Sequence, residues 1–254
     1  MIERFFETIE LPITAEQFHK LPYNPAYKYE YFGDCAWLTP WPKFCHALLH
    51  LRDRSGVSDA LDALGPVCIR PLRDADWDLL ADPFSQAFFR VFPFSTLDDD
   101  DRLGAGDECL RHTRNSGDGP LIASACFVAA EADHGEPVGA ILVTLWPDRD
   151  LSDWGAGDWP EPPPPDCLEQ RLGVPHLTWI FVDPLVRGYG VGTALLHAAV
   201  NVLLEMGYDR LSSTVLQGND SSLLWHWRIG FELLEDPGSQ RRIRRQRRAL
   251  RTGP

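Results

Sequence analysis

The sequence contains no hydrophobic run long enough to span a bilayer, and its first residues, MIERFFETIE, do not follow the pattern of a signal peptide. It also lacks a C-x-x-C pair, because its six cysteines are scattered along the chain. Without paired cysteines or an export signal, a disulfide framework is not expected. We therefore predict reduced thiols in a cytoplasmic protein that does not bind membranes.

Two familiar phosphate-binding patterns are also missing, although a glycine-rich stretch, RGYGVGTALL, occupies residues 187–196. A nucleotide P-loop needs a lysine after its glycines, and none follows here. A dinucleotide fingerprint needs a third glycine where Thr193 stands. Glycines that lead into a helix still suit a phosphate, because the backbone can turn tightly and the first helical amides are unpaired.

Charge is unevenly distributed along the 254 residues, whose formal net charge is −13. The C-terminal segment 239–254 contains seven arginines and no acidic residue, so the rest of the chain is more acidic than the total suggests. An acidic body repels nucleic acid and favours cationic partners or substrates. The Arg-rich tail, 237–254, either binds an acidic partner or nucleic acid, or packs on the acidic body. We expect only a weak, salt-sensitive effect, with nucleic acid not a main ligand.

Strand-like and helix-like segments alternate from Val67 onward. One helix carries buried positions at four-residue spacing and is expected to end at Gly207, and Asn219 is a natural N-cap for the next. We predict a mixed α/β fold with a central, mostly antiparallel sheet flanked by helices. Predicted strands are 67–72, 121–130, 137–146, 176–183, 210–216 and 231–235; predicted helical segments are 74–92 (interrupted at Pro83), one opening at 97–103, one following Gly192, and 219–229.

Residues 1–65 form an N-terminal extension of unknown role. Within it, Gly33 and Asp34 are expected to turn a hairpin, and 43–51 looks helical. On such a helix His46 and His50 would share a face, a spacing that can bind zinc. The H-E-x-x-H glutamate and a third ligand are missing, so no metal site is predicted.

A Pro-rich insertion, 147–175, holds seven acidic residues against two arginines. It also contains Trp154 and Trp159 and is preceded by Trp146. Carboxylates and aromatic faces together can receive a cationic amine. The insertion therefore favours a positively charged substrate, with a merely solvated loop as the alternative.

Two segments of the chain resemble the GNAT superfamily of acetyl-CoA-dependent N-acetyltransferases. The signature [QR]-x-x-G-x-[GA] is met by Arg187, Gly190 and Gly192, after the strand WIFVDP. A second pattern, N-x-x-A-x-x-L-Y-x-x-x-G-F, is echoed by NDSSLLWHWRIGF at 219–231. The resemblance implies a GNAT-like acetyltransferase domain over residues 66–236.

The same resemblance implies acetyl-CoA as co-substrate. Its pyrophosphate would be held by the amides of the glycine turn, and its pantetheine arm would lie beside the preceding strand, with Asn219 on the other side. A backbone N–H of that strand could stabilise the oxyanion of the tetrahedral intermediate. The implied cofactor-binding residues are Ile180, Phe181, Val182, Arg187, Gly188, Tyr189, Gly190, Val191, Gly192 and Asn219.

Two histidines occupy positions where relatives carry other catalytic groups. His226 stands in place of a tyrosine that protonates the leaving thiolate, and its alternative role is packing between two tryptophans. His176 stands where one branch carries a glutamate base; alternatively it is a solvated histidine at a strand end. Strand alternation would place His176 on one face with Ile180 and Val182. Thr214 replaces the glutamate of other relatives.

The predicted function is that of an N-acetyltransferase. It would move an acetyl group from acetyl-CoA to a primary amine, a cationic one being favoured, by direct attack. The acceptor would be a small molecule or a peptide amine, and a homodimer is an expected assembly. The alternative is a non-catalytic acyl-CoA-binding or interaction module whose active site is degenerate.

Overall fold

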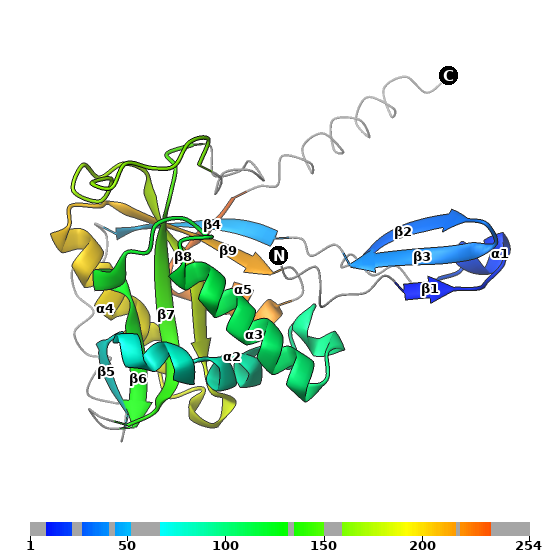
Figure 1. The fold of residues 1–254 in the computed structure, drawn as a ribbon, viewed down its shortest axis with the longest axis horizontal. Helices are drawn as coiled ribbons and strands as arrows, with labels where there is room; N and C mark the ends of the chain where they lie inside the picture. The colour runs from blue at the N-terminus through cyan, green and yellow to red at the C-terminus, as the bar shows by residue number, and fades with distance from the viewer. Residues whose placement is uncertain are drawn as a thin grey trace.

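The computed structural model describes residues 9–21, 27–40, 44–51, 67–131, 135–149, 159–216 and 219–234. The strands form two sheets (Figure 1). The strands are β1 (Ile9–Leu11), β2 (Tyr27–Phe32), β3 (Cys35–Pro40), β4 (Phe44–His50), β5 (Val67–Pro71), β6 (Phe127–Glu131), β7 (Pro137–Trp146), β8 (Val174–Val182), β9 (Arg210–Leu216) and β10 (Glu232–Leu233).

The larger sheet has seven strands in the order β10-β4-β9-β8-β7-β6-β5, and the smaller has the order β1-β3-β2. Every neighbouring pair is antiparallel except β8 and β9. The predicted mixed, mostly antiparallel sheet flanked by helices is confirmed. The helices are α1 (Ala15–Phe18), α2 (Ala81–Phe88), α3 (Asp99–Arg114), α4 (Val191–Glu205) and α5 (Asp220–Arg228), and 3-10 helices cover Asp74–Leu79, Phe94–Thr96, Ala123–Ala125 and Pro184–Val186.

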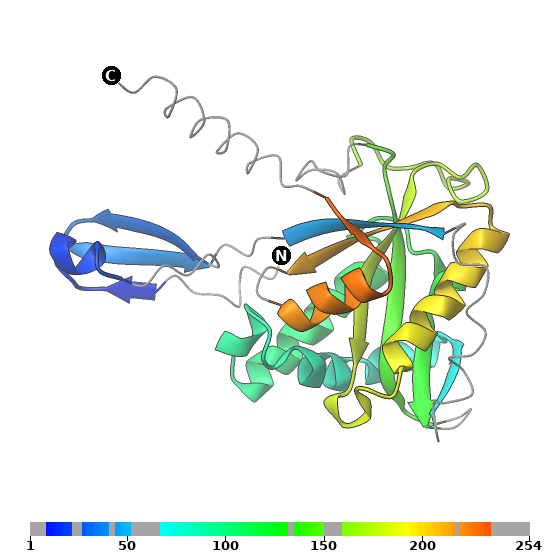
Figure 2. The same ribbon diagram turned by 180° about the vertical axis from the view of Figure 1, so that it is seen from behind.

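The large sheet is covered on both faces: α2 and α3 lie on one face, and α4 and α5 on the other (Figures 1 and 2). Each face has its own apolar cluster. On the α4 side, Leu195 and Leu196 pack with Ile141 and Leu177 of the sheet. On the α2 side, aromatic rings dominate, and Phe84 contacts the rings of Phe88, Phe94, Trp179 and Phe181.

Local signals located most elements of this sheet. The bounds of β7 and β9 agree with the prediction, and Asn219 caps α5 as expected. The predicted helix 74–92 is divided at Leu80, and not at Pro83, which lies in the first turn of α2, where its missing N–H costs no hydrogen bond. The strand predicted over 121–130 begins only at Phe127, because residues 123–125 form a 3-10 turn.

The helix predicted over 43–51 is wrong, because Phe44–His50 is strand β4, paired with β9 on one side and β10 on the other. Ala47 and Leu49 are both buried, which is the two-residue period of a strand. Pairing within the sheet imposes this strand conformation, although alanine and leucine also favour helices. On a strand, the Cα atoms of His46 and His50 are about 13 Å apart, too far for one shared ion. The extension 1–65 therefore supplies a strand to the sheet of the predicted domain.

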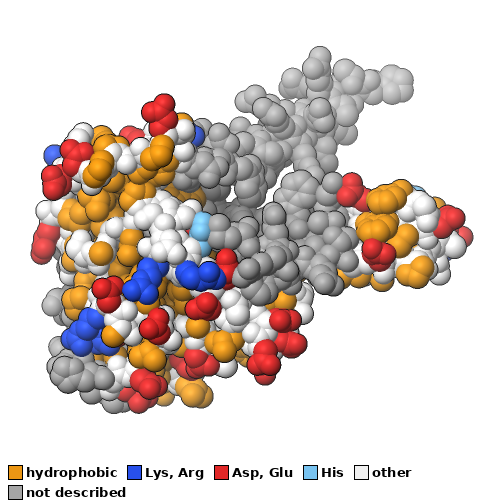
Figure 3. Space-filling model, viewed as in Figure 1, with side chains coloured by type: hydrophobic (Ala, Val, Ile, Leu, Met, Phe, Trp, Pro, Cys, Tyr) orange, Lys and Arg blue, Asp and Glu red, His pale blue; other side chains and the backbone are white. Residues whose placement is uncertain are grey.

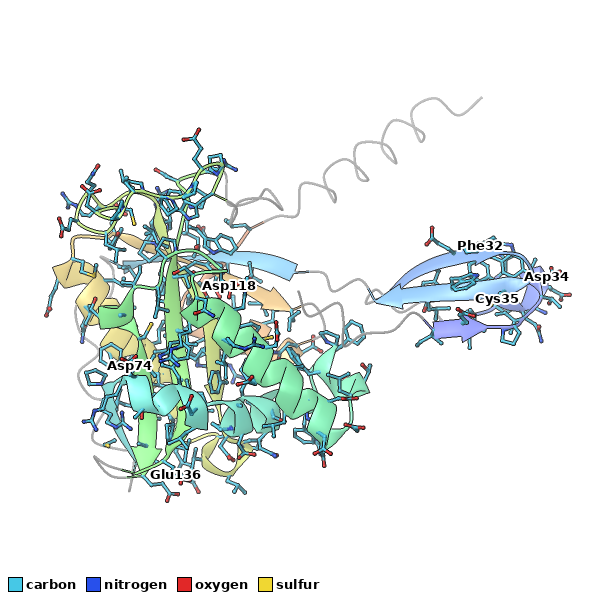
Figure 4. All side chains as sticks on the ribbon, viewed as in Figure 1. Phe32, Asp34, Cys35, Asp74, Asp118 and Glu136 are labelled. Atoms are coloured by element: carbon cyan, nitrogen blue, oxygen red, sulfur yellow. The ribbon has the colours of Figure 1, made fainter. Side chains whose placement is uncertain are left out.

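The small sheet contains the hairpin predicted at Gly33 and Asp34. Both residues have positive φ, +61° and +56°, as a two-residue hairpin turn of type I′ requires. They join β2 to β3, with Phe32 opposite Cys35. Phe32 also stacks on Trp37 at 5.1 Å between ring centroids (Figure 4).

Two kinds of feature are absent from the described residues. In this part of the chain, no helix combines the length and apolar character that a membrane span needs. Among the same residues, no three His, Cys, Asp or Glu side chains gather as metal ligands would.

A buried ion pair anchors the 3-10 helix that follows β5. The Arg70 guanidinium donates to both carboxylate oxygens of Asp76 at 2.7 Å, and both side chains are less than a tenth exposed. Burial raises the pKa of Asp76, but hydrogen bonds from Arg70 and the Arg73 amide outweigh it, so the pKa lies below its ordinary value.

Replacing Asp76 with Asn should lower the free energy of unfolding by about 3 kcal/mol at pH 7, because Arg70 would remain buried without its counter-ion. A lowered carboxyl pKa stabilises the fold above the ordinary carboxyl range. That contribution is lost as the pH falls through the lowered value, so the deficit should shrink below about pH 4. Urea denaturation at both pH values measures this.

The matched control is Asp74→Asn, because the Asp74 side chain is 97% exposed. It should change stability by less than about 0.5 kcal/mol. Equal effects of the two substitutions would contradict a special role for the buried pair.

Candidate active site

The parallel strands β8 and β9 pair over only two residues. His176 is opposite Ser212, and Leu177 is opposite Ser213. Beyond Leu177, β8 continues to Val182 while pairing, within the described residues, with β7 alone. The two strands diverge there (Figure 2). One backbone edge of β8 is thereby left for an extended ligand to pair with.

The divergence ends at the glycine turn. Gly188 and Gly190 have φ of +92° and +83°, and a Cβ at either position would meet no atom within 4 Å. Glycine is therefore needed for the backbone conformation and not for close packing. Gly190 is the N-cap of α4. Because glycine has no side chain, the cap residue offers the first amides of the helix no side-chain acceptor.

The other residues of the turn face solvent or the core. The Arg187 guanidinium donates to the Ala87 carbonyl at 3.3 Å, at the end of α2, and Tyr189 is 66% exposed. Val191 is buried against the α4-side cluster. Val191 could therefore serve a ligand only through its backbone.

The three residues predicted to line the pantetheine arm belong to the core through their side chains. Phe181 packs on the α2 side, while Ile180 and Val182 pack on the α4 side. Phe181 is buried, whereas Ile180 and Val182 are half-buried, and the contacts predicted with the arm are those of their backbone groups.

Helix α5 lies against the start of α4. The Trp225 indole N–H donates to the Thr193 hydroxyl at 3.2 Å, and a Cβ on Gly192 would contact both Val182 and Trp225. The Asn219 Oδ1 accepts the Ser222 amide at 3.2 Å as the cap of α5. The end of β8, the start of α4 and the body of α5 are thus held together.

His226 is buried with both ring nitrogens hydrogen-bonded. Nδ1 lies 2.8 Å from the Ser222 carbonyl, which only accepts, so Nδ1 carries the proton. Nε2 lies 3.0 Å from the Ser213 hydroxyl and accepts from it in the neutral ring. Burial lowers the pKa of His226, although the Ser222 carbonyl partly opposes this. This geometry favours the packing role that the sequence left open.

His176 is also buried, at 1% exposure, and is not a solvated histidine. Its ring stacks on Trp146 at 3.4 Å and 10°, and Nδ1 lies 2.9 Å from the Ser212 hydroxyl. The expectation that it shares a face with Ile180 and Val182 is wrong. A β-bulge opposite Leu142 and Val143 inserts a residue, which moves His176 to the α2 side.

The α2 side of the sheet is polar around His176. The Thr144 hydroxyl lies 2.8 Å from that of Thr178 and donates to the Asp118 carbonyl at 2.9 Å. Figure 4 places Asp118 beyond the end of α3, over β7 and β8. The run Ser-Ser-Thr at 212–214 is the part of the sequence that could have indicated this surface. Alternate hydroxyls along it contact His176 on one face of the sheet and His226 on the other.

The described part of the insertion, 147–149 and 159–173, contains turns but no helix or strand. The Trp159 indole donates to the Leu145 carbonyl at 2.9 Å. Trp146 is engaged by His176. These two rings are therefore occupied within the protein, and Trp154 and the Arg-rich tail 237–254 lie outside the described residues.

Residues 79–231, more than half of the chain, match the model of the acetyltransferase (GNAT) family. The chain belongs to this family. The predictions of a GNAT fold and of an acyltransferase are thereby confirmed. No curated protein matches the sequence of this GNAT acetyltransferase.

Several solved structures are similar to this chain. A GCN5-related N-acetyltransferase from Sphaerobacter thermophilus is 14% identical over 90% of this chain, with a TM-score of 0.48, and this chain spans 57% of its length. A GNAT family acetyltransferase from Brucella melitensis, solved with acetyl-CoA, is 19% identical over 66% of this chain and 86% of that chain, with a TM-score of 0.43. The aminoglycoside N-acetyltransferase AAC(6')-Iy, solved with CoA, is 22% identical over 66% of this chain and 90% of that chain, with a TM-score of 0.42.

Replacing His226 with Gln should flatten the dependence of unfolding free energy on pH. A histidine whose pKa is lowered by folding binds fewer protons in the native state. Stability is then fully present above the ordinary histidine pKa of about 6.5 and falls as the pH drops below it. Urea denaturation at pH 7 and pH 5 should give a larger difference for the wild type than for the variant.

The control is His19→Gln, which makes the same substitution at an exposed position directly after α1, and the flattening should be larger for the His226 variant than for this one. Equal slopes for the His226 variant and the wild type would contradict a buried neutral ring. If His226 instead donated the proton to the thiolate, turnover of its Gln variant would fall by about 100-fold.

Proposed function

We propose that this GNAT acetyltransferase transfers an acetyl group from acetyl-CoA to a primary amine by direct attack. The observation that carries the proposal is the divergence of β8 and β9, which ends at a glycine turn and a helix start. Amides of Gly188–Gly192 would hold the pyrophosphate, with Arg187 beside them. The pantetheine arm would pair with the open edge of β8 over Ile180–Val182, and Asn219 would face it from α5.

The chemistry then needs few side chains. A β8 amide would donate to the thioester oxygen, which becomes an oxyanion as the amine attacks. Collapse of the tetrahedral intermediate breaks the carbon–sulfur bond, and the attacking nitrogen can pass its remaining extra proton to the thiolate. We assign His226 to packing, because its two nitrogens are engaged by Ser213 and Ser222. His176 remains the proposed base for the incoming ammonium group.

A cationic acceptor is supported by charge. Acidic side chains are spread over the face that α2 and α3 cover (Figure 3). In the insertion, Glu161 and Glu169 are exposed. Such a surface raises the local concentration of cations and favours an amine with a second positive charge.

Replacing Gly190 with Ala should weaken acetyl-CoA binding by at least about tenfold, as measured by calorimetric titration. A left-handed conformation costs an alanine about 1 kcal/mol or more, so the turn would rearrange and displace its amides. The matched control is Gly192→Ala, whose Cβ would make only ordinary contacts at 3.8 Å and 4.0 Å. Equal affinities for the two variants would remove the glycine turn from the cofactor site.

The charge argument predicts that 1,5-diaminopentane is acetylated with a higher kcat/KM than 5-amino-1-pentanol, which has the same length and one cation fewer. The advantage should shrink as salt rises from 0.05 to 0.5 M, because screening weakens long-range attraction. Thiol release measures both rates. Equal values for the two amines at low salt would exclude charge as a determinant of the acceptor.

A further inference from the structure

Thr214 is the outermost member of a chain of hydrogen bonds that crosses from β9 to β8. Its Oγ1 lies 3.4 Å from Nε2 of His176, whose Nδ1 lies 2.9 Å from the Ser212 hydroxyl. The Ser212 hydroxyl in turn donates to the Pro175 carbonyl at 3.1 Å. His176 is 1% exposed, whereas Thr214 is only half-buried.

The direction of these bonds follows from the carbonyl at the inner end. Because Ser212 gives its only proton to Pro175, its oxygen must accept from His176, so Nδ1 carries the ring proton. In the neutral ring, Nε2 then holds the lone pair and accepts from the Thr214 hydroxyl. The lone pairs of the Thr214 oxygen remain for a donor outside.

Thr214 also lies where a substrate would meet the sheet. It follows Ser213, the last β9 residue paired with β8, and therefore stands at the start of the divergence. One face of the His176 ring is covered by Trp146. An amine at the divergence would thus reach Thr214 before it could reach the imidazole.

We propose that Thr214 is a catalytic residue that relays a proton from the acceptor to His176, with Ser212 as a positioning residue. This proposal rests on the proposed function. The ammonium form of the acceptor gives one proton to Thr214 Oγ1, while the original Thr214 proton moves to Nε2. The freed nitrogen lone pair attacks the thioester carbon, and its own surplus proton later goes to the thiolate sulfur. The imidazolium proton returns to solvent.

Other ionisable groups around this chain are left unchanged by the test. His46 stands opposite Thr214 in the register of β4, and Asp118 lies over the polar face. Asp148 pairs with Arg210 at 2.8 Å near the start of β9. A change in the pH dependence of turnover that is confined to the Thr214 and Ser212 variants is therefore attributable to the relay.

The first test is turnover with 1,5-diaminopentane between pH 6 and 9. Thr214→Val should lower kcat by about 100-fold near pH 7, the lower end of general-base effects, with acetyl-CoA affinity unchanged. The loss should shrink toward pH 9, where more of the amine is already neutral. Thr214→Ser, which keeps a hydroxyl, should restore most of the rate. Thr144→Val is the control, since it removes a buried hydroxyl from the same face but outside the relay.

A wild-type rate and pH profile for Thr214→Val would overturn the relay alone. Failure of the wild type to bind acetyl-CoA or to release thiol with any amine would overturn the proposed function itself. A second measurement needs no acceptor: nitrogen NMR of His176, assigned with a His176→Gln variant, should show the proton on Nδ1. A proton on Nε2 of the neutral ring would exclude the relay, and Ser212→Ala should alter this tautomer preference.

Discussion

The candidate site depends on one constraint: the parallel strands β8 and β9 pair at only two adjacent positions and then separate. Up to Leu177 and Ser213, β8 and β9 are paired, so the sheet is continuous between them. Past that point β8 pairs, among the described residues, with β7 alone, and the chain turns at Gly188 and Gly190 before α4 begins. At the same point Thr214 lies half-buried on the α2 face of the sheet, so the proposed cofactor and acceptor sites would meet where the two strands separate.

Elements whose signals are local were predictable from the sequence. The bounds of β7 and β9, the cap at Asn219 and the turn at Gly33 each depend on side chains within a few residues. Strand β4 was not predictable in this way, because residues that favour helices are held extended by strands from the other end of the chain.

The candidate site was predictable only in part, since sequence position does not determine orientation. Gly188 and Gly190 were recognised because positive φ demands glycine. For His176, one bulge reversed the face that simple alternation gives. For His226, the family position suggested a proton donor, whereas the hydrogen bonds to Ser213 and Ser222 depend on how α5 packs on β9. These partners are tertiary, and no motif records them.

The position of β4 has a consequence for how the protein reaches its fold. β4 precedes β5 to β8 in the chain, whereas its neighbours β9 and β10 follow them, so β4 cannot pair until those later strands have been made. Pairing between distant segments is slow because loop closure must precede any gain in contacts. During that interval β4 itself lacks both neighbours, so completion of this edge of the large sheet is expected to be a late step in folding.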